Sequence, residues 1–195
     1  MKRLLLILIL SFSFQSWSAA DDIRDFEIEG MSIGDSLLDF INKKQIIKSK
    51  RNYFADERKY YAVGYDDNLK RYDTLDIYLS SDDKDYIIKG ITGFKFMNMN
   101  KCLLQKKTIV NQISELFKNT KRHDNPSATH EVDTTGKSIE DQTAFLLDGN
   151  LIGNNVKVSC MDWSNKITKE KNWSDNLGIS ATSNELSEWM NSGYK

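Results

Sequence analysis

Hydrophobic and polar positions alternate along much of this chain, and one long stretch departs from that alternation. Over residues 101–118 the apolar side chains recur at three- and four-residue steps, the period of a helix with one buried side. At a rise of about 1.5 Å per residue, such a helix is long enough to cross a small domain. The sequence therefore predicts a central packing helix whose buried side carries Cys102, Leu103, Ile109, Val110, Ile113, Leu116 and Phe117.

Before this helix the pattern predicts strands and one further helix. Residues 23–29 alternate as in a half-buried strand, and Gly30 ends the alternation. Residues 31–44 then show apolar positions at helical spacing. Three more strands are expected, over residues 59–65, 72–79 and 85–96, and a polar turn joins the last two as a hairpin.

After the central helix the same reasoning predicts a second group of strands. Residues 119–136 are polar and are expected to form a long loop with one edge strand. A hairpin over 142–147 and 156–163, a charged loop over 165–175 and a strand over 177–181 follow. Thr182 and Glu185 have capping-box spacing, which predicts a terminal helix with Leu186, Trp189 and Met190 facing inward.

The order of these elements, β-α-βββ-α-βββ-α, predicts the fold class. We expect one α+β domain in which antiparallel sheet packs on two or three helices. Its two helix-then-three-strand groups indicate two tandem α-βββ units, with halves at 21–98 and 99–195, at the level of element order rather than of residues.

The first twenty residues have the features of a signal peptide. Lys2 and Arg3 form a basic n-region, residues 4–14 an apolar h-region, and small residues precede Ala20. The apolar run is shorter than the roughly 20 residues of a spanning helix. We therefore expect cleavage near Ala20 and a mature domain of residues 21–195 without a transmembrane segment, periplasmic or secreted; a retained N-terminal anchor is the alternative.

Charge and cysteine content narrow the class of protein further. The 27 basic and 28 acidic side chains give a net charge of −1, which offers no electrostatic basis for binding nucleic acid. Cys102 and Cys160 are the two cysteines, and in an exported protein such a pair predicts one disulfide. Two buried free thiols or a redox pair are the alternatives, although the close spacing of a redox motif is absent.

Catalytic and metal-binding patterns are weak in this sequence. His123, Asp124, His130, Glu131 and Asp133 share one polar loop, but their spacing matches no standard zinc site, so we predict no metal and no cofactor. The signatures G-x-S-x-G and H-E-x-x-H do not occur. Catalysis by a pair of carboxylates stays open, because such a pair is assembled in space rather than in sequence.

Tyrosine is the one residue type whose distribution indicates a function. Seven of the eight tyrosines lie between Tyr53 and Tyr86. In the expected strand 72–79, Tyr72, Thr74, Asp76 and Tyr78 share the face opposite the apolar positions. Exposed tyrosine is favoured at recognition surfaces, so this face is the candidate binding surface. Ordinary strand propensity with cross-strand pairing is the alternative explanation.

Three resemblances bear on the architecture. The stretch EGMSIGDSLLDFI resembles the Gly-Met entry to the first helix of small outer-membrane-assembly lipoproteins, and the tandem α-β order resembles secreted β-lactamase-inhibitor proteins. The stretches DFEIEGMSIGDSLLDF, YDTLDIYLSSDDKDY and MDWSNKITKEKNWSDNLGISATSNELSEWMN resemble an uncharacterised family of small exported proteins from AT-rich marine alphaproteobacteria. That resemblance implies export and supplies no site residue.

The leading functional hypothesis is a non-catalytic binding or envelope-associated module that uses the tyrosine-rich sheet face. Its partner would be a protein or another envelope component. The alternatives are a small exported hydrolase with carboxylates in a cleft between the two halves, and a secreted inhibitor-like protein.

Overall fold

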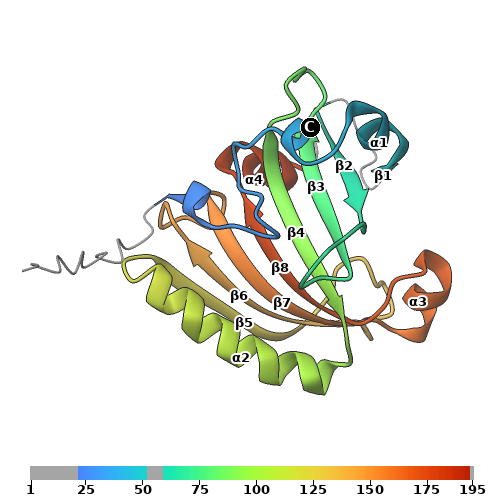
Figure 1. Cartoon of the computed structure of the whole chain (residues 1–195). Helices are drawn as coiled ribbons and strands as arrows, with labels where there is room; N and C mark the ends of the chain where they lie inside the picture. Colours follow the sequence, from blue (N-terminus) through green and yellow to red (C-terminus); the bar gives the residue numbers. More distant parts are fainter. Residues whose placement is uncertain (1–21, 52–58, 194–195) are drawn as a thin grey trace, which may run out of the picture.

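The computed structural model describes residues 22–51 and 59–193. It is an α+β structure dominated by one eight-stranded antiparallel sheet in the order β1-β2-β3-β4-β8-β7-β6-β5 (Figure 1). The strands are β1 Lys50–Arg51, β2 Tyr60–Tyr65, β3 Thr74–Ser80, β4 Ile88–Phe96, β5 Lys121–Thr129, β6 Ile139–Leu146, β7 Asn155–Asp162 and β8 Asn176–Thr182. Two meanders, β1–β4 and β5–β8, meet where β4 pairs with β8, so both halves of the chain share one sheet.

Four α-helices accompany the sheet: α1 Lys43–Lys48, α2 Met99–Leu116, α3 Asn165–Lys171 and α4 Asn184–Asn191. Helix α2 connects the two meanders and lies across the β5–β8 half, whereas α4 lies on the other side of the sheet (Figure 1). Each helix begins at a side-chain cap, and Asn98 caps α2 by accepting from the Lys101 N–H. Among the described residues, no helix is long and apolar enough to cross a bilayer.

The N-terminal part differs from the sequence prediction. The expected strand over 23–29 is wrong, because Ile23–Asp25 form a 3₁₀ turn capped by Asp22. The expected helix over 31–44 is reduced to a second 3₁₀ turn at Leu37–Asp39, followed by the short α1. Gly34 has a φ of +96°, which ends any helix through this segment. Ile33, Leu37 and Ile41 are buried at helical spacing, but the segment that carries them is not an α-helix. The spacing of buried residues alone therefore led to the wrong prediction.

The number of strands in each half was also underestimated. The short β1 precedes β2, and the expected edge strand in 119–136 extends over nine residues as β5. Each half of the sheet is therefore a four-stranded meander rather than a three-stranded group. The expected charged loop 165–175 contains α3, which Ser164 caps by accepting from the Ile167 N–H.

The main core lies on one face of the sheet, which we call the helix-covered face. It includes Leu75 and Ile77 of β3, Val158 of β7 and Ile179 of β8, all at most 7% exposed. Helix α2 and the N-terminal segment cover this face and remove its apolar side chains from water. Burial of apolar surface stabilises the fold by about 25 cal/mol for each Å². The opposite side, which carries Thr74 and Asp76, is called the open face.

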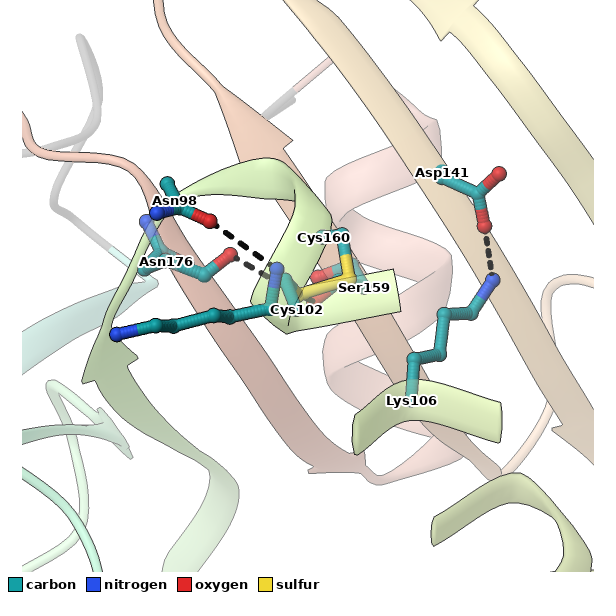
Figure 2. The surroundings of a disulfide bond; sticks show 8 residues. Asn98, Cys102, Lys106, Asp141, Ser159, Cys160 and Asn176 are labelled. Carbon is teal, nitrogen blue, oxygen red and sulfur yellow. Dashed lines mark hydrogen bonds and ion pairs between the residues drawn. A yellow bond between two sulfur atoms is a disulfide. The ribbon is translucent and has the colours of Figure 1, made fainter. Parts of the chain in front are cut away.

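Helix α2 is attached to the helix-covered face covalently and by charge. Cys102 Sγ lies 1.99 Å from Cys160 Sγ of β7, with the Cα atoms 5.7 Å apart, so the expected pair forms a disulfide (Figure 2). One turn later, the Lys106 ammonium forms an ion pair with Asp141 of β6 beneath the helix (Figure 2). These contacts fix which side of the helix faces the sheet.

The buried side of α2 is narrower than predicted. Cys102, Val110 and Ile113 are buried as expected, but Leu103 and Leu116 are 39% and 36% exposed. Lys106 is buried in their place, because its ammonium has a carboxylate partner and its methylene chain packs under the helix.

Helix α4 covers part of the open face. Leu186 and Trp189 of α4 pack with Tyr60 into a small second core, with Tyr78 beside it. The helix N-cap is Ser183, one residue after the expected Thr182, and its side chain accepts from the Leu186 N–H.

Strand β5 forms one edge of the sheet, and its sequence interrupts that edge. Its pairing with β6 shifts register between Asn125 and Ala128, and Pro126 lies inside the interruption. All but one of its nine residues are exposed.

Candidate functional site

The open face carries a groove of about 490 Å³. A volume of this size falls within the range of about 300–1,000 Å³ that is usual for ligand sites. The described residues that line it are Arg51, Thr74, Asp76, Tyr78, Phe94, Phe96, His130, Val132, Trp163, Asn172, Trp173, Ser174 and Asn176. Six of them carry an aromatic ring and most others have a hydrogen-bonding side chain, a composition typical of recognition sites.

Interior strands form the floor of the groove. Thr74 and Asp76 come from β3, Phe94 from β4 and Asn176 from β8, and the register places Thr74 opposite Phe94. Each of these strands is hydrogen-bonded on both sides. The floor therefore offers side chains to a ligand, while its backbone groups are used within the sheet.

One wall consists of an ion pair held by β1. Arg51 Nη1 lies 2.8 Å from Asp76 Oδ1, and Arg51 Nη2 donates to Thr74 Oγ1 at 3.2 Å. Asp76 is 3% exposed, so the guanidinium compensates a carboxylate that has lost most of its water. Gly64 of β2 makes room for this contact, because a Cβ there would lie 1.9 Å from Arg51 Nε.

The facing wall is aromatic. The ring centroids of Trp163 and Trp173 lie 4.7 Å apart, and His130 meets Trp163 edge to face at 4.9 Å. The Val132 N–H donates to His130 Nδ1 at 3.2 Å, which orients the imidazole. Mutual packing fixes the rings and leaves their outer surfaces toward the groove.

Two loops hold this aromatic wall in place. The loop after β5 is locked by Asp133, which accepts from the N–H and hydroxyl groups of Thr135 and Ser138 at 2.6–3.0 Å. Hydrogen bonding, led by the Thr135 hydroxyl, holds the pKa of Asp133 well below its ordinary value. Ser138 Oγ in turn accepts from the Ser164 N–H, which ties this loop to the start of α3.

The segments on either side of α3 present the two tryptophans. The backbone N–H of Trp163 donates to Asp175 Oδ1 at 2.8 Å, which joins the segment before α3 to the segment after it. Asn172 ends the helix with a φ of +55° and turns the chain so that Trp173 returns over Trp163. The segment that carries the two tryptophans is thus held at both ends by the contact between Trp163 and Asp175.

One polar group in the floor has no partner among the described residues. Asn176 Nδ2 donates to the Ser174 carbonyl at 2.9 Å, but Asn176 Oδ1 accepts no hydrogen bond. Asn176 is 6% exposed, so this oxygen has lost its water as well. Such an acceptor carries a desolvation cost that no hydrogen bond offsets within the described residues.

The structure brings together three of the four residues expected at the binding surface. Thr74, Asp76 and Tyr78 line the groove. Tyr72 lies on the helix-covered side instead, where its ring occupies the space above Gly93 and burial raises its pKa to about 12. Strand β3 begins at Thr74, so the alternation that places Thr74 and Asp76 on one face does not extend back to Tyr72.

Sequence reasoning missed the remaining walls of the groove. Arg51 was assigned to no strand, and His130 was treated only as a candidate metal ligand. Trp163 and Trp173 flank one charged segment, and that pairing is the signal in the sequence that pointed toward them. Their contact depends on α3, which was not predicted.

The ionisable groups that line the groove are Arg51, Asp76, Tyr78 and His130 among the described residues. Asp76 is the one carboxylate among its described lining residues, and it is engaged by Arg51. Two other acids, Asp162 and Asp175, lie near the loop that carries Trp163 and Trp173, and burial, followed by the Asp175 charge, raises the pKa of Asp162. Neither acid lines the groove, and residues 22–51 and 59–193 contain no cluster of three or more His, Cys, Asp or Glu side chains suited to a metal.

No protein-family model, curated protein or solved structure matches the chain. The groove itself is therefore the basis for the functional argument.

Proposed function

We propose that this chain is an exported, non-catalytic binding protein that holds its ligand in the groove on the open face of the sheet. The observation that carries this proposal is the pairing of a fixed aromatic wall, Trp163 with Trp173, with the Arg51–Asp76 pair across one floor. Aromatic rings and arginine are enriched among the residues that carry most binding energy at recognition sites, the rings because they bring large contact area and arginine because its planar fork makes several hydrogen bonds.

The buried disulfide supports the exported part of the proposal. Cys102 and Cys160 are both fully buried and joined, which fits the oxidising compartment expected from the N-terminal sequence. Residues 1–20, the expected signal peptide, lie outside the described residues. The resemblance to small exported proteins of marine alphaproteobacteria supports the same compartment, periplasmic or secreted.

The continuous sheet supports a simple domain organisation for this binding protein. Each four-stranded meander follows a helix, α1 or α2, and the two meanders join side by side. We propose that the domain comprises two tandem helix-and-meander units within residues 21–195, with the groove spanning their junction at β4 and β8.

Intrinsic tryptophan emission provides a direct test of groove occupancy. Two of the three tryptophans after residue 20, Trp163 and Trp173, form the groove wall, and Trp189 lies in the second core. The mature protein is titrated with a panel of neutral oligosaccharides, anionic oligosaccharides and peptides. At least one class should change the emission and raise the melting temperature.

Two variants separate groove binding from other effects. Trp173→Ala should lower the affinity for the ligand at least tenfold, whereas Leu104→Ala on α2 should leave it unchanged, since Leu104 is 74% exposed and is not among the residues that line the groove. A panel in which no class binds, or binding that survives Trp173→Ala, would refute the proposal.

The same titration distinguishes the alternative functions. The ligand is recovered after prolonged incubation and its length is measured by chromatography. Unchanged ligand is expected; shortened ligand would identify the exported hydrolase instead. Groove-dependent binding of a folded protein, with no small ligand, would identify the inhibitor-like alternative.

A further inference from the structure

We propose that the ligand of this groove is a neutral oligosaccharide chain. This inference rests on the proposed binding function and specifies its ligand class. Four properties of the groove support it. The groove has exposed aromatic rings, its polar groups both donate and accept hydrogen bonds, its charges balance, and the backbone groups of its floor strands are already paired within the sheet.

The ring surfaces suit the C–H faces of sugar rings. A pyranose ring carries hydroxyl groups around its edge and C–H groups on its faces, so it stacks on an aromatic plane while its edge stays polar. Trp163 and Trp173 supply such planes on one wall, and Phe96, 53% exposed, supplies another at the rim. The tilt of 52° between the indoles gives successive rings two platforms rather than one flat surface.

The polar groups of the groove donate and accept within short reach of one another. Arg51 is a donor and Asp76 an acceptor, Thr74 is both, and the amides of Asn172 and Asn176 add both kinds. A hydroxyl also donates and accepts, and neighbouring hydroxyls on a sugar match the two-atom geometry of planar side chains.

The charge balance favours a ligand without net charge. The described lining carries one guanidinium and one carboxylate, and these lie 2.8 Å apart. Because Arg51 already interacts with Asp76 and Thr74, a ligand carboxylate or phosphate would compete with a nearly buried anion for it. The groove therefore selects against anionic chains as well as cationic ones.

The floor disfavours an extended peptide. Peptides that bind sheets usually add a strand to an exposed edge and so satisfy their backbone N–H and C=O groups. Here the floor strands β3, β4 and β8 are interior, with ladders filled on both sides. A peptide lying across them could not add to the sheet and would gain no backbone hydrogen bonds from these strands.

Binding to immobilised neutral glycans tests this inference. The mature protein is applied to an array of neutral glycans and run through native gels that contain dextran, galactomannan, laminarin or soluble starch. At least one neutral glycan should bind, and its gel should retard the protein. Trp173→Ala should abolish the retardation, Trp173→Phe should retain part of it because a ring remains, and Leu104→Ala should match the wild type.

The outcomes separate this inference from the proposed function. If only peptides or anionic chains bind in a Trp173-dependent manner, the ligand class is wrong while the binding function stands. If no class binds the groove, both are wrong. Circular dichroism and melting curves of each variant confirm that the loss of retardation is not a loss of folding.

Discussion

Arg51 on the edge strand β1 contacts Asp76 on β3 across the whole width of β2, with 2.8 Å between the guanidinium and the carboxylate. The contact requires Gly64, since any side chain at this position of β2 would occupy the path of Arg51. A glycine inside a strand ordinarily weakens it, so its presence here is explained by the close approach of the arginine.

Gly64→Ala should therefore act through Arg51. The added methyl group displaces the guanidinium and leaves Asp76 without that cation, which should cost about 1–3 kcal/mol of unfolding free energy, less than a fully buried pair because Arg51 is partly exposed. Urea unfolding measures the cost. Arg51→Ala with Gly64→Ala should be little more destabilising than Arg51→Ala alone; additive effects would show that Gly64 has a separate role.

Tyr72→Ala should destabilise the protein without altering the groove. The ring packs against the main core above Gly93, so its removal should cost about 2–4 kcal/mol. Ligand affinity, measured well below the melting temperature, should stay at the wild-type value, whereas Thr74→Val should weaken binding at little cost in stability. A drop in affinity for Tyr72→Ala in the folded protein would contradict the assignment of Tyr72 to the helix-covered side.

The Lys106–Asp141 pair beneath α2 should behave as a unit. Lys106→Met removes the cation and leaves a carboxylate under the helix, which should cost about 2–4 kcal/mol. Combined Lys106→Met and Asp141→Leu should recover to within about 1 kcal/mol of the wild type, because neither charge is then buried. Denaturant titration of the two variants decides the matter; a double variant as unstable as the single one would mean that the charges orient the helix.

The ionisation of Asp133 should make the stability of the protein depend on pH, because its carboxylate holds the loop beside the aromatic wall. Its pKa is depressed in the folded state, so its contribution to stability is complete above the ordinary value of about 3.9 and is lost as the pH falls through the folded value. Asp133→Asn should lower the melting temperature at pH 7, and the difference from wild type should narrow below about pH 4. A difference that is constant from pH 7 to pH 2 would show that the charge on Asp133 is unimportant.

The disulfide should contribute mainly through the unfolded chain. The cysteines are 58 residues apart, and closing a loop of this length lowers the entropy of the unfolded state by the equivalent of about 4 kcal/mol. Cys102→Ser with Cys160→Ser should lose up to about that amount in urea unfolding. Groove affinity in the remaining folded fraction should be unchanged, since neither cysteine lines the groove.

The sequence specified local structure better than the assembly of the site. The hairpin strands β2, β3 and β4 follow from alternation, and Cys102 meets Cys160 because an exported pair has one plausible partner. Thr74, Asp76 and Tyr78 share a face for the same reason. The prediction for Tyr72 was wrong because β3 begins two residues later, at Thr74. The preceding loop sets this boundary, and the alternation of apolar and polar residues does not reveal it.

The aromatic wall lay beyond sequence reasoning for a different reason. Trp163 and Trp173 are separated by a helix that is short, strongly charged and stabilised by the Ser164 cap and by contacts with the loop after β5. Local propensity does not reveal contacts of this kind. The position of Arg51 likewise depends on a two-residue strand, which is too short to show any alternation.

The interrupted edge of β5 has a consequence for how molecules of this protein meet. An uninterrupted strand of nine exposed residues would present a row of donors and acceptors to any neighbouring sheet, and copies could then join into a continuous ribbon. Pro126 lacks an N–H, the register shift bends the row, and the exposed Lys121 places a charge at the start of the edge. At high concentration these features oppose fibre formation and favour separate, dispersed molecules.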